Sequence, residues 1–529
     1  MSSAVMNNPP PGTAAEAQVT LRNWLAVLGA ALGAFMAVLD IQIVNSSLQD
    51  IQGALGATLD ESTWISTSYL VAEIITIPLT AWLSRAFSAR WYVAVNAILF
   101  VIFSVCCAWA WDLNSMIAFR ALQGLTGGTL IPMAFNVILT SLPPSKRPIG
   151  MAIFSVTATF APSIGPAIGG WLTDTFGWQY IFFLNIIPGL IMVPVLLLTL
   201  PKEPMNLKLL KDGDWFGILS MAMGMGCLEV VLEEGNRKDW FGSSLILNLA
   251  IVAAVSLIAF LWRELTAKKP LINLRLLTNR NFGFGSVANV ALGFGLYGSV
   301  YALPVYLAQV QGYDALQIGT VMMWLGLPQL LLIPFIPHLM KRIDPRLLLA
   351  IGILLFACSC FMNSWMSADT AGPQMIMSQL VRACGQPLIM IPLSTLTTSG
   401  IKANEAGSAS ALFNMMRNLG GSIGVAMLST LLTRREQFHS VRIGESVFMT
   451  SPAVQDRIHQ LTQFFASRGA DLVTAQTQAL KMIDNVVRRE SFMMAFNDVF
   501  FTLGVALLIS IVAVTMLKKP QGQAAAGVH

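Results

Sequence analysis

Six ionisable side chains lie inside long apolar stretches of the sequence. Such residues are costly in a hydrocarbon environment, and they mark sites that bind an ion, carry a proton or pair with one another. The acidic groups can take up and release protons, whereas the arginines keep their charge. The set comprises Asp40, Glu73, Arg120, Glu229, Arg382 and Arg417. Their chemistry predicts that protons or charged solutes move through the interior of the protein.

Two of these residues are expected to lie at the same depth. At about 1.5 Å per residue, Asp40 lies 6 Å below the outer end of the apolar stretch 22–45, and Arg120 lies 8 Å below the outer end of 115–141. They can therefore meet as an ion pair. Arg120 shares a helical face with Gln123 and several glycines, so we expect its side chain to face protein or water rather than lipid.

The other four charges have different predicted environments. Glu73 lies near the middle of its stretch, where a carboxylate can carry a proton. Glu229 lies near the outer end of its stretch, and a position at the membrane interface is favoured over a coupling role. Arg382 and Arg417 could bind an anionic substrate or donate to backbone carbonyls, and both alternatives stay open.

A motif of small residues and prolines occupies residues 157–171, T-A-T-F-A-P-S-I-G-P-A-I-G-G-W. Its members are Ala161, Pro162, Gly165, Pro166, Gly169 and Gly170. Ala161, Gly165 and Gly169 recur every four residues, so another helix can approach this face closely. Each proline removes a backbone donor. The motif predicts either a simple packing stripe or, as we favour, a bendable helix at a moving interface between two halves of a transporter.

The composition identifies a membrane protein. Of 529 residues, 55% are hydrophobic and only 11% are charged, against about 25% charged in soluble domains. The net charge of +5 comes from short clusters between apolar runs, which indicates topology signals and no nucleic-acid partner. The six cysteines and four histidines are scattered, so we expect no disulfide framework, no metal site and no catalytic residues.

Fourteen apolar runs are long enough to span a bilayer. They cover residues 22–45, 62–84, 91–111, 115–141, 149–172, 179–200, 214–232, 243–262, 282–308, 318–340, 347–366, 374–399, 408–432 and 494–517. Lysines and arginines are concentrated in the loops on the side of the amino terminus, and the short loops opposite contain only Arg237 and Lys238. The positive-inside rule therefore places both termini in the cytoplasm.

A weak internal repeat divides these runs into two sets of six. R-A-L-Q-G at 120–124 matches R-A-C-G-Q at 382–386, and each lies in the fourth run of its set. The predicted organisation is a disordered tail (1–21), a six-helix bundle (22–200), a linker with two inserted helices (201–281), a second six-helix bundle (282–517) and a tail (518–529). Within the second bundle, loop 433–493 contains two amphipathic patterns. They predict two helices outside the membrane, as an inert connector or a docking surface.

Several motifs resemble the fourteen-helix drug/proton antiporters of the major facilitator superfamily, and more closely their EmrB-type pumps. The motifs are V-L-D-I-Q-I-V-N (38–45), R-A-L-Q-G (120–124), A-P-S-I-G-P-A-I-G-G (161–170) and R-N-L-G-G-S-I-G (417–424). One motif departs from the superfamily: after the second run, Ala81, Arg85 and Ser88 occupy the positions of Gly, Asp and Gly. A gating role for that loop is therefore in doubt.

The resemblance implies an all-α major facilitator fold of two six-helix halves with two inserted central helices. It implies proton-coupled export of amphipathic compounds across the bacterial inner membrane, with a periplasmic adaptor and an outer-membrane channel as partners. Asp40, Arg120 and Glu73 would couple protons, the only cofactor expected. Substrate binding or gating would involve Asn45, Gln123, Glu229, Arg382 and Arg417.

Two other functions stay open from the sequence. One is a solo exporter of a specific metabolite, fatty acid or siderophore. The other, more remote, is a membrane-embedded enzyme or receptor, although no loop combines a nucleophile with a base or places metal ligands at usable spacing.

Overall fold

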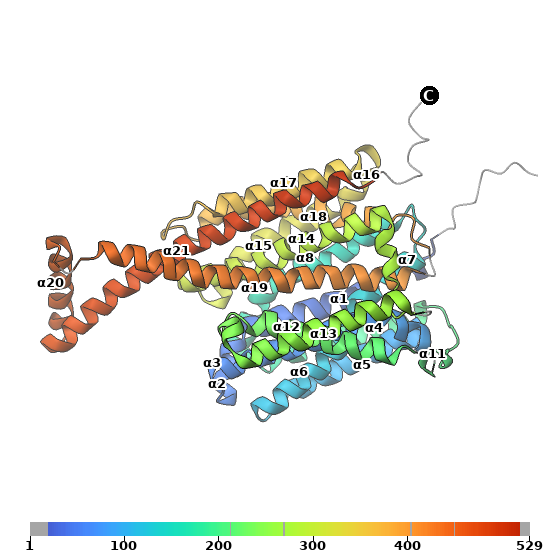
Figure 1. The fold of residues 1–529 in the computed structure, drawn as a ribbon, viewed down its shortest axis with the longest axis horizontal. Coiled ribbons are helices and arrows are strands. Elements are labelled where there is room, and N and C mark those ends of the chain that lie inside the picture. Colours follow the sequence, from blue (N-terminus) through green and yellow to red (C-terminus); the bar gives the residue numbers. More distant parts are fainter. Residues whose placement is uncertain (1–18, 212, 268–269, 403–404, 449, 519–529) are drawn as a thin grey trace, which may run out of the picture.

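The computed structural model of the chain describes residues 19–518, apart from residues 212, 268–269, 403–404 and 449. All regular secondary structure in these ranges is helical. Among the described residues, twelve helices are long and apolar enough to cross a membrane. The helices α18 (Gly372–Thr397) and α19 (Ala406–Ser446) run beside them through the same bundle (Figure 1). The predicted all-α polytopic fold is confirmed. The tails predicted at 1–21 and 518–529 lie almost entirely outside the described residues.

The helices follow the order of two halves and an insert. The first half contains α1 (Leu21–Ser46), α2 (Leu48–Leu55), α3 (Leu59–Ser62), α4 (Trp64–Phe87), α5 (Ala89–Ala108), α6 (Leu113–Gly127), α7 (Leu130–Ser141), α8 (Arg147–Phe176), α9 (Tyr180–Phe183) and α10 (Ile186–Thr199). The insert contains α11 (Lys208–Lys211), α12 (Trp215–Glu234), η1 (Trp240–Gly242) and α13 (Ser244–Thr266). The second half contains η2 (Leu274–Thr278), α14 (Arg280–Gln309), α15 (Ala315–Leu332), η3 (Ile333–Phe335), α16 (Ile336–Arg342), α17 (Pro345–Asn363), α18, α19, α20 (Pro452–Ser467) and α21 (Leu472–Thr515).

Three spans that the sequence predicts as single helices are interrupted. The fourth span divides into α6 and α7 around Gly128, and the sixth divides into α9 and α10. The tenth consists of α15, η3 and α16, where Pro334 and Pro337 each lack the backbone donor that a continuous helix uses. Breaks of this kind are tolerated in a membrane protein where neighbouring helices cover the freed carbonyls.

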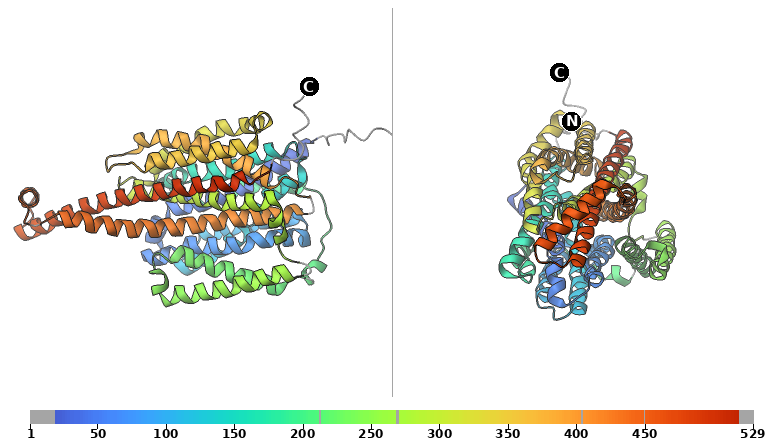
Figure 2. Two further views of the ribbon diagram at one scale, coloured as in Figure 1. Left: turned by 45° about the horizontal axis from the view of Figure 1, so that its top comes forward. Right: turned by 90° about the vertical axis from the view of Figure 1, so that its left-hand side faces the viewer.

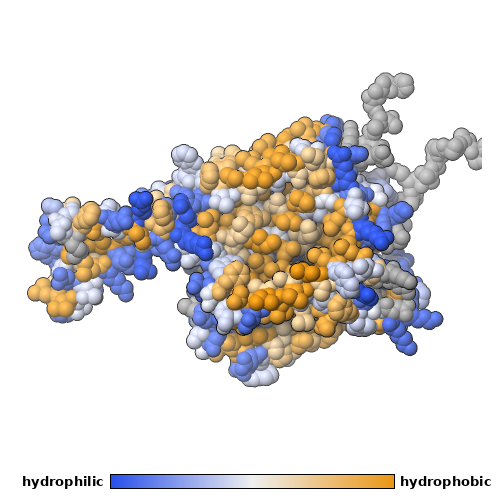
Figure 3. Space-filling view, viewed as in Figure 1, coloured by the Kyte–Doolittle hydropathy of each residue, from blue (hydrophilic) through white to orange (hydrophobic). Residues whose placement is uncertain are grey.

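The surface of the bundle has the apolar band expected of a protein that spans a membrane. Apolar residues form a broad band across the helices, and hydrophilic residues gather at the ends and on the part that extends beyond the bundle (Figure 3). On α13 the side chains of Ile251, Val255 and Ile258 are all exposed. This helix therefore presents a face suited to lipid.

The two halves touch along two sets of helices. The helix α8 packs against α15 and α18, while α4 and α7 pack against α19. Helix α1 begins and α21 ends at the same end of the bundle, as an even number of spans requires (Figure 2).

At the opposite end, α19 and α21 continue beyond the bundle to meet α20 (Figure 1). The prediction of two separate helices in loop 433–493 is half right. The pattern at 454–465 forms α20, but the second pattern is the first part of α21. Because no turn residue interrupts the chain between this pattern and the last span, the helix continues without a break.

Candidate functional site

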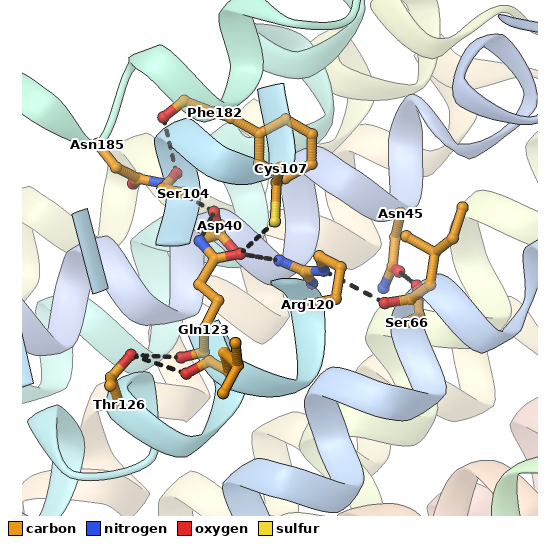
Figure 4. Close-up of polar contacts among 12 residues, drawn as sticks. Asp40, Asn45, Ser66, Ser104, Cys107, Arg120, Gln123, Thr126, Phe182 and Asn185 are labelled. Atoms are coloured by element: carbon orange, nitrogen blue, oxygen red, sulfur yellow. Dashed lines mark hydrogen bonds and ion pairs between the residues drawn. The ribbon is translucent and has the colours of Figure 1, made fainter. Parts of the chain in front are cut away.

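Asp40 and Arg120 form a buried ion pair between α1 and α6, as their predicted depths allow (Figure 4). Arg120 Nη1 donates to Asp40 Oδ2 at 2.7 Å. The exposed fractions are 2% for Asp40 and 1% for Arg120. A pair in this setting depends on good geometry and on further hydrogen bonds, because both groups have left water.

Further hydrogen bonds satisfy both charges. Gln123 Nε2 (3.0 Å) and Asn185 Nδ2 (2.7 Å) donate to Asp40 Oδ1. Arg120 donates to Gln123 Oε1 at 2.8 Å and to the Ile65 carbonyl at 3.2 Å. Asp40 on α1 therefore accepts two hydrogen bonds from α6 and one from Asn185 at the start of α10, and its protonation would disturb all three contacts.

Close helix packing positions Arg120 against α4. A Cβ atom at Gly124 would lie 2.9 Å from Tyr69 Cα, and one at Gly128 would lie 3.0 Å from Glu73 Cα. Only glycine permits this approach. It places the Arg120 guanidinium 4.3 Å from the centre of the Tyr69 ring, where a cation–π interaction adds to the ion pair.

Three residues of this site were missed by sequence reasoning. They are Asn185, Ser104 and Cys107. Ser104 Oγ accepts from Asn185 Nδ2 at 3.0 Å, and Cys107 Sγ donates to Gln123 Oε1 at 3.6 Å. A polar residue in an otherwise apolar helix is the signal that could have found Ser104 and Asn185.

Asn45 lies further along α1 and does not join the Asp40 network. Its Oδ1 accepts a hydrogen bond from Ser66 Oγ at 2.7 Å and links α1 to α4 (Figure 4). Its predicted part in substrate binding or gating is untested by these contacts.

A second group of charges lies where α4, α12 and α19 meet. Glu73, Glu229 and Arg417 are buried, and Glu73 interacts electrostatically with each of the other two. Arg417 Nη2 donates to Asn414 Oδ1 at 3.1 Å, but its Nε and Nη1 have no partner among the described residues. The free donors leave this group able to take a further ligand or water.

Glu229, for which the sequence favours an interfacial position near the end of its helix, is covered by protein. It is 2% exposed, and its Oε1 accepts from Ser422 Oγ of α19 at 2.8 Å. Glu229 lies near the carboxyl end of α12, but α4 and α19 cover that end. Sequence spacing gives depth along a helix and does not show which neighbours shield it.

The second half contains its own buried arginine. Arg382 of α18 is 3% exposed, and its guanidinium lies 5.2 Å from the centre of the Phe356 ring. Neither Arg382 nor Arg417 donates to a backbone carbonyl within the described ranges, so that alternative is not realised here.

The end of the inserted helix connects the two halves. On one side, Glu234 Oε1 accepts from Thr63 Oγ1 (3.0 Å) and Thr67 Oγ1 (3.2 Å) at the start of α4. Arg237 also contacts Glu234 and Thr63. Residues 229–240, which we call the α12 bridge, are thereby fixed to the first half.

The α12 bridge is also fixed to the second half. Besides Glu229, Trp240 Nε1 donates to Thr430 Oγ1 at 3.1 Å, and Asn236 Nδ2 donates to Thr433 Oγ1 at 3.2 Å. Separation of α4 from α19 at this end must break one of the two sets of hydrogen bonds. The insert is therefore part of the contact between the halves.

The small-residue stripe of α8 packs closely, but against its own half. A Cβ at Gly165 would lie 2.5 Å from Gln42 Cβ, and one at Gly169 would lie 3.0 Å from the Ile43 carbonyl oxygen, both on α1. This face therefore lies within the first half rather than between the halves. Helix α8 does border the other half, but through a different face.

That other face contains Ser163, Ala167 and Gly170. A Cβ at Gly319 of α15 would lie 2.5 Å from Ala167 Cα, and one at Gly170 would lie 2.9 Å from Ala315 Cβ. Pro162 and Pro166 lie inside an α8 that runs continuously from Arg147 to Phe176.

The loop after α4 keeps the backbone shape that glycine usually provides. Ser88 has φ of +67°, in the left-handed region. Arg85 Nε donates to the Ala81 carbonyl of its own helix at 3.1 Å, and no bond from Arg85 to the second half is found among the described residues.

No group of three or more His, Cys, Asp or Glu residues that could hold a metal ion is found among the described residues. The site consists of buried charges joined by hydrogen bonds.

Comparison with known proteins agrees with this architecture. The Major Facilitator Superfamily profile matches residues 30–425. The chain is 34% identical to the colistin resistance protein EmrB of Acinetobacter baumannii, over 92% of this chain and 94% of that protein. It is 32% identical to the multidrug export protein EmrB of Escherichia coli K12, over 95% and 97% of the two chains.

Two further proteins are similar to this chain, one in sequence and one in fold. The fatty acid resistance protein FarB of Neisseria gonorrhoeae is 34% identical, over 99% of this chain and 100% of that protein. The solved structure of the human organic anion transporter MFSD10 has the same fold, with a TM-score of 0.58 at 12% identity over 93% and 99% of the two chains. The chain belongs to the major facilitator superfamily of transporters, in the group that contains the EmrB export proteins.

Proposed function

We propose that the protein is a proton-coupled multidrug efflux transporter of the bacterial inner membrane, with both termini in the cytoplasm, and not an enzyme. The observation that carries the proposal is the Asp40–Arg120 pair, because a protonatable group on α1 that is bonded to α6 and to the start of α10 can link proton uptake to helix movement. The names of the EmrB relatives support a role in drug export.

The coupling follows from what protonation does to the pair. A proton on Asp40 removes the negative charge that Arg120 needs, which weakens the bond between α1 and α6. Each protonation state then favours a different arrangement of the helices. Glu73 and Arg417, placed between the halves, are candidates for a second proton site and a substrate contact.

Susceptibility of a deletion strain tests this function. We expect loss of the protein to increase susceptibility to several chemically unrelated compounds among dyes, uncouplers, bile salts and fatty acids. Complementation with the intact gene serves as the control. Increased susceptibility to fatty acids alone would contradict multidrug efflux and favour the second candidate, a solo exporter of a specific compound. The FarB match supports fatty acids as that compound.

We also propose that the extension of α19, α20 and α21 binds a periplasmic adaptor that leads to an outer-membrane channel. The extension exposes Phe464, Val473 and Val486, which is more apolar surface than an inert connector needs. A shallow pocket of about 490 Å³ lies between α20 and α21 and is lined by Phe465, Met482 and Arg489 among others.

Shortening the extension tests the adaptor proposal. Deletion of residues 445–485 should abolish resistance, because the surface that would contact the adaptor is removed while the bundle is retained. Membrane insertion, measured by fractionation and by a carboxyl-terminal fluorescent tag, should be unchanged. Full resistance in cells expressing the shortened protein would refute the docking role.

A further inference from the structure

The second half repeats the Arg120 site without its acid. Arg382, like Arg120, lies in the fourth span of its half, and each guanidinium faces an aromatic ring of a neighbouring helix. A buried cysteine interacts with each arginine, Cys107 in the first half and Cys360 in the second. The two sites are therefore counterparts in the internal repeat.

The partners of the two arginines differ in charge. Arg120 has the carboxylate of Asp40 at 2.7 Å. Arg382 has no carboxylate within ion-pair distance in the described part of the chain, and its neighbours are amides. A guanidinium keeps its charge when buried. A buried charge without a counter-ion is strongly unfavourable in the interior of a membrane protein.

The amides around Arg382 leave hydrogen-bonding capacity unused. With the Gln386 amide turned so that its oxygen faces the guanidinium, this oxygen accepts from Arg382 Nε at 3.0 Å and Nη2 at 3.2 Å. Two of the five guanidinium N–H groups are then used. Gln386 in turn lies 2.7 Å from the amide of Gln329 on α15.

Gln379 is the second observation that points to a ligand. It lies three residues before Arg382 on the same face of α18 and is 0% exposed. Neither its Nε2 nor its Oε1 has a hydrogen-bond partner among the described residues. Buried amides are almost always bonded, so an unbonded one beside an uncompensated arginine indicates a site for an acceptor group.

We propose that Arg382 and Gln379 form a binding site for a carboxylate, supplied either by a small free anion or by the head group of an amphipathic anion. The fork of N–H donors on arginine matches a carboxylate in a bidentate arrangement, and the Gln379 amide adds a donor. Helix α18 packs against α8 of the other half, so the site lies on a helix that borders the contact between the halves. As a substrate subsite, it rests on the proposed transport function.

A single substitution can supply the missing charge from the protein itself. Gln379→Glu changes only the amide to a carboxylate, and a carboxylate at this position can pair with Arg382 as Asp40 pairs with Arg120. We expect the variant to lose octanoate binding by tenfold or more, roughly the effect of one charged hydrogen bond, and to unfold at a higher temperature. The matched control is Gln374→Glu, the same change at an exposed position near the start of α18.

Binding is measured by titration calorimetry on the full chain in nanodiscs of neutral lipid, with octanoate and acetate as probes. No proton gradient is needed, so the result is independent of whether transport is observed in proteoliposomes. Arg382→Lys keeps the charge without the fork and should bind octanoate weakly. Equal binding of acetate and octanoate to the intact chain would support the site and identify a small free anion as its occupant.

Two outcomes would overturn the proposal. One is unchanged octanoate affinity in a folded Gln379→Glu protein. The other is equal weakening by Gln374→Glu, which would show that added charge anywhere on α18 repels the probe.

Discussion

Asp40→Asn is expected to abolish efflux driven by a pH gradient while substrate exchange without a gradient continues. The asparagine side chain resembles the protonated acid in shape, so Gln123 and Asn185 retain a partner. Asparagine cannot ionise, so the alternation between a charged and a neutral side chain that would move α1 and α6 is lost. Gradient-driven efflux should fall by about 10- to 100-fold, the range expected for loss of a charged hydrogen bond.

The measurement is efflux of a fluorescent dye from everted vesicles under an imposed pH gradient, together with counterflow in its absence. Asp50→Asn provides the matched control, because Asp50 lies on the exposed surface of α2. Arg120→Ala should impair both activities, since it leaves Asp40 as a buried carboxylate without its counter-ion. Full gradient-driven transport by Asp40→Asn would assign proton carriage to another group, and Glu73 would be the next candidate.

Gly319→Leu should stop transport by preventing contact between the halves. At this position even a Cβ atom would lie 2.5 Å from Ala167 Cα and 2.6 Å from Ala167 N, so the obstacle is backbone and cannot rotate away. Overpacking of this kind costs about 1–3 kcal/mol. Because the contact joins separate bundles, the halves can relieve it by moving apart, and the fold should survive.

Dye efflux and thermal unfolding of the purified variant test this expectation together. Efflux should fall to background with a small change in unfolding temperature, and cysteines introduced at the outer ends of α8 and α15 should become more accessible to thiol reagents. Gly53→Leu serves as the control, since a Cβ at Gly53 would meet nothing within 4 Å. Wild-type efflux from Gly319→Leu would show that closure along α8 and α15 is not required.

The sequence predicts features that depend on distance along a helix. Hydropathy and length gave the spans, and a rise of about 1.5 Å per residue was enough to place Asp40 and Arg120 at one depth. The internal repeat at 120–124 and 382–386 also corresponds to equivalent sites in the structure.

Features that depend on rotation around a helix could not be predicted as well. The face of α8 with Gly165 and Gly169 is close-packed as expected, but the sequence does not show that α1 rather than α15 covers it. For the same reason the sequence does not show that α4 and α19 cover Glu229. Asn185 reaches Asp40 only because α9 and α10 divide near this residue, a break that apolar composition does not reveal.

Helix α21 is unbroken over 44 residues, about 66 Å at 1.5 Å per residue. Its first part lies outside the bundle beside α20, and its last part packs against α14 and α17 within the membrane. A rigid rod anchored at one end acts as a lever, so a small tilt of the second half during each cycle becomes a larger sideways displacement at the far tip. A protein bound at that tip would be displaced when the transporter changes its conformation. By linkage, its binding would favour or oppose that conformational change.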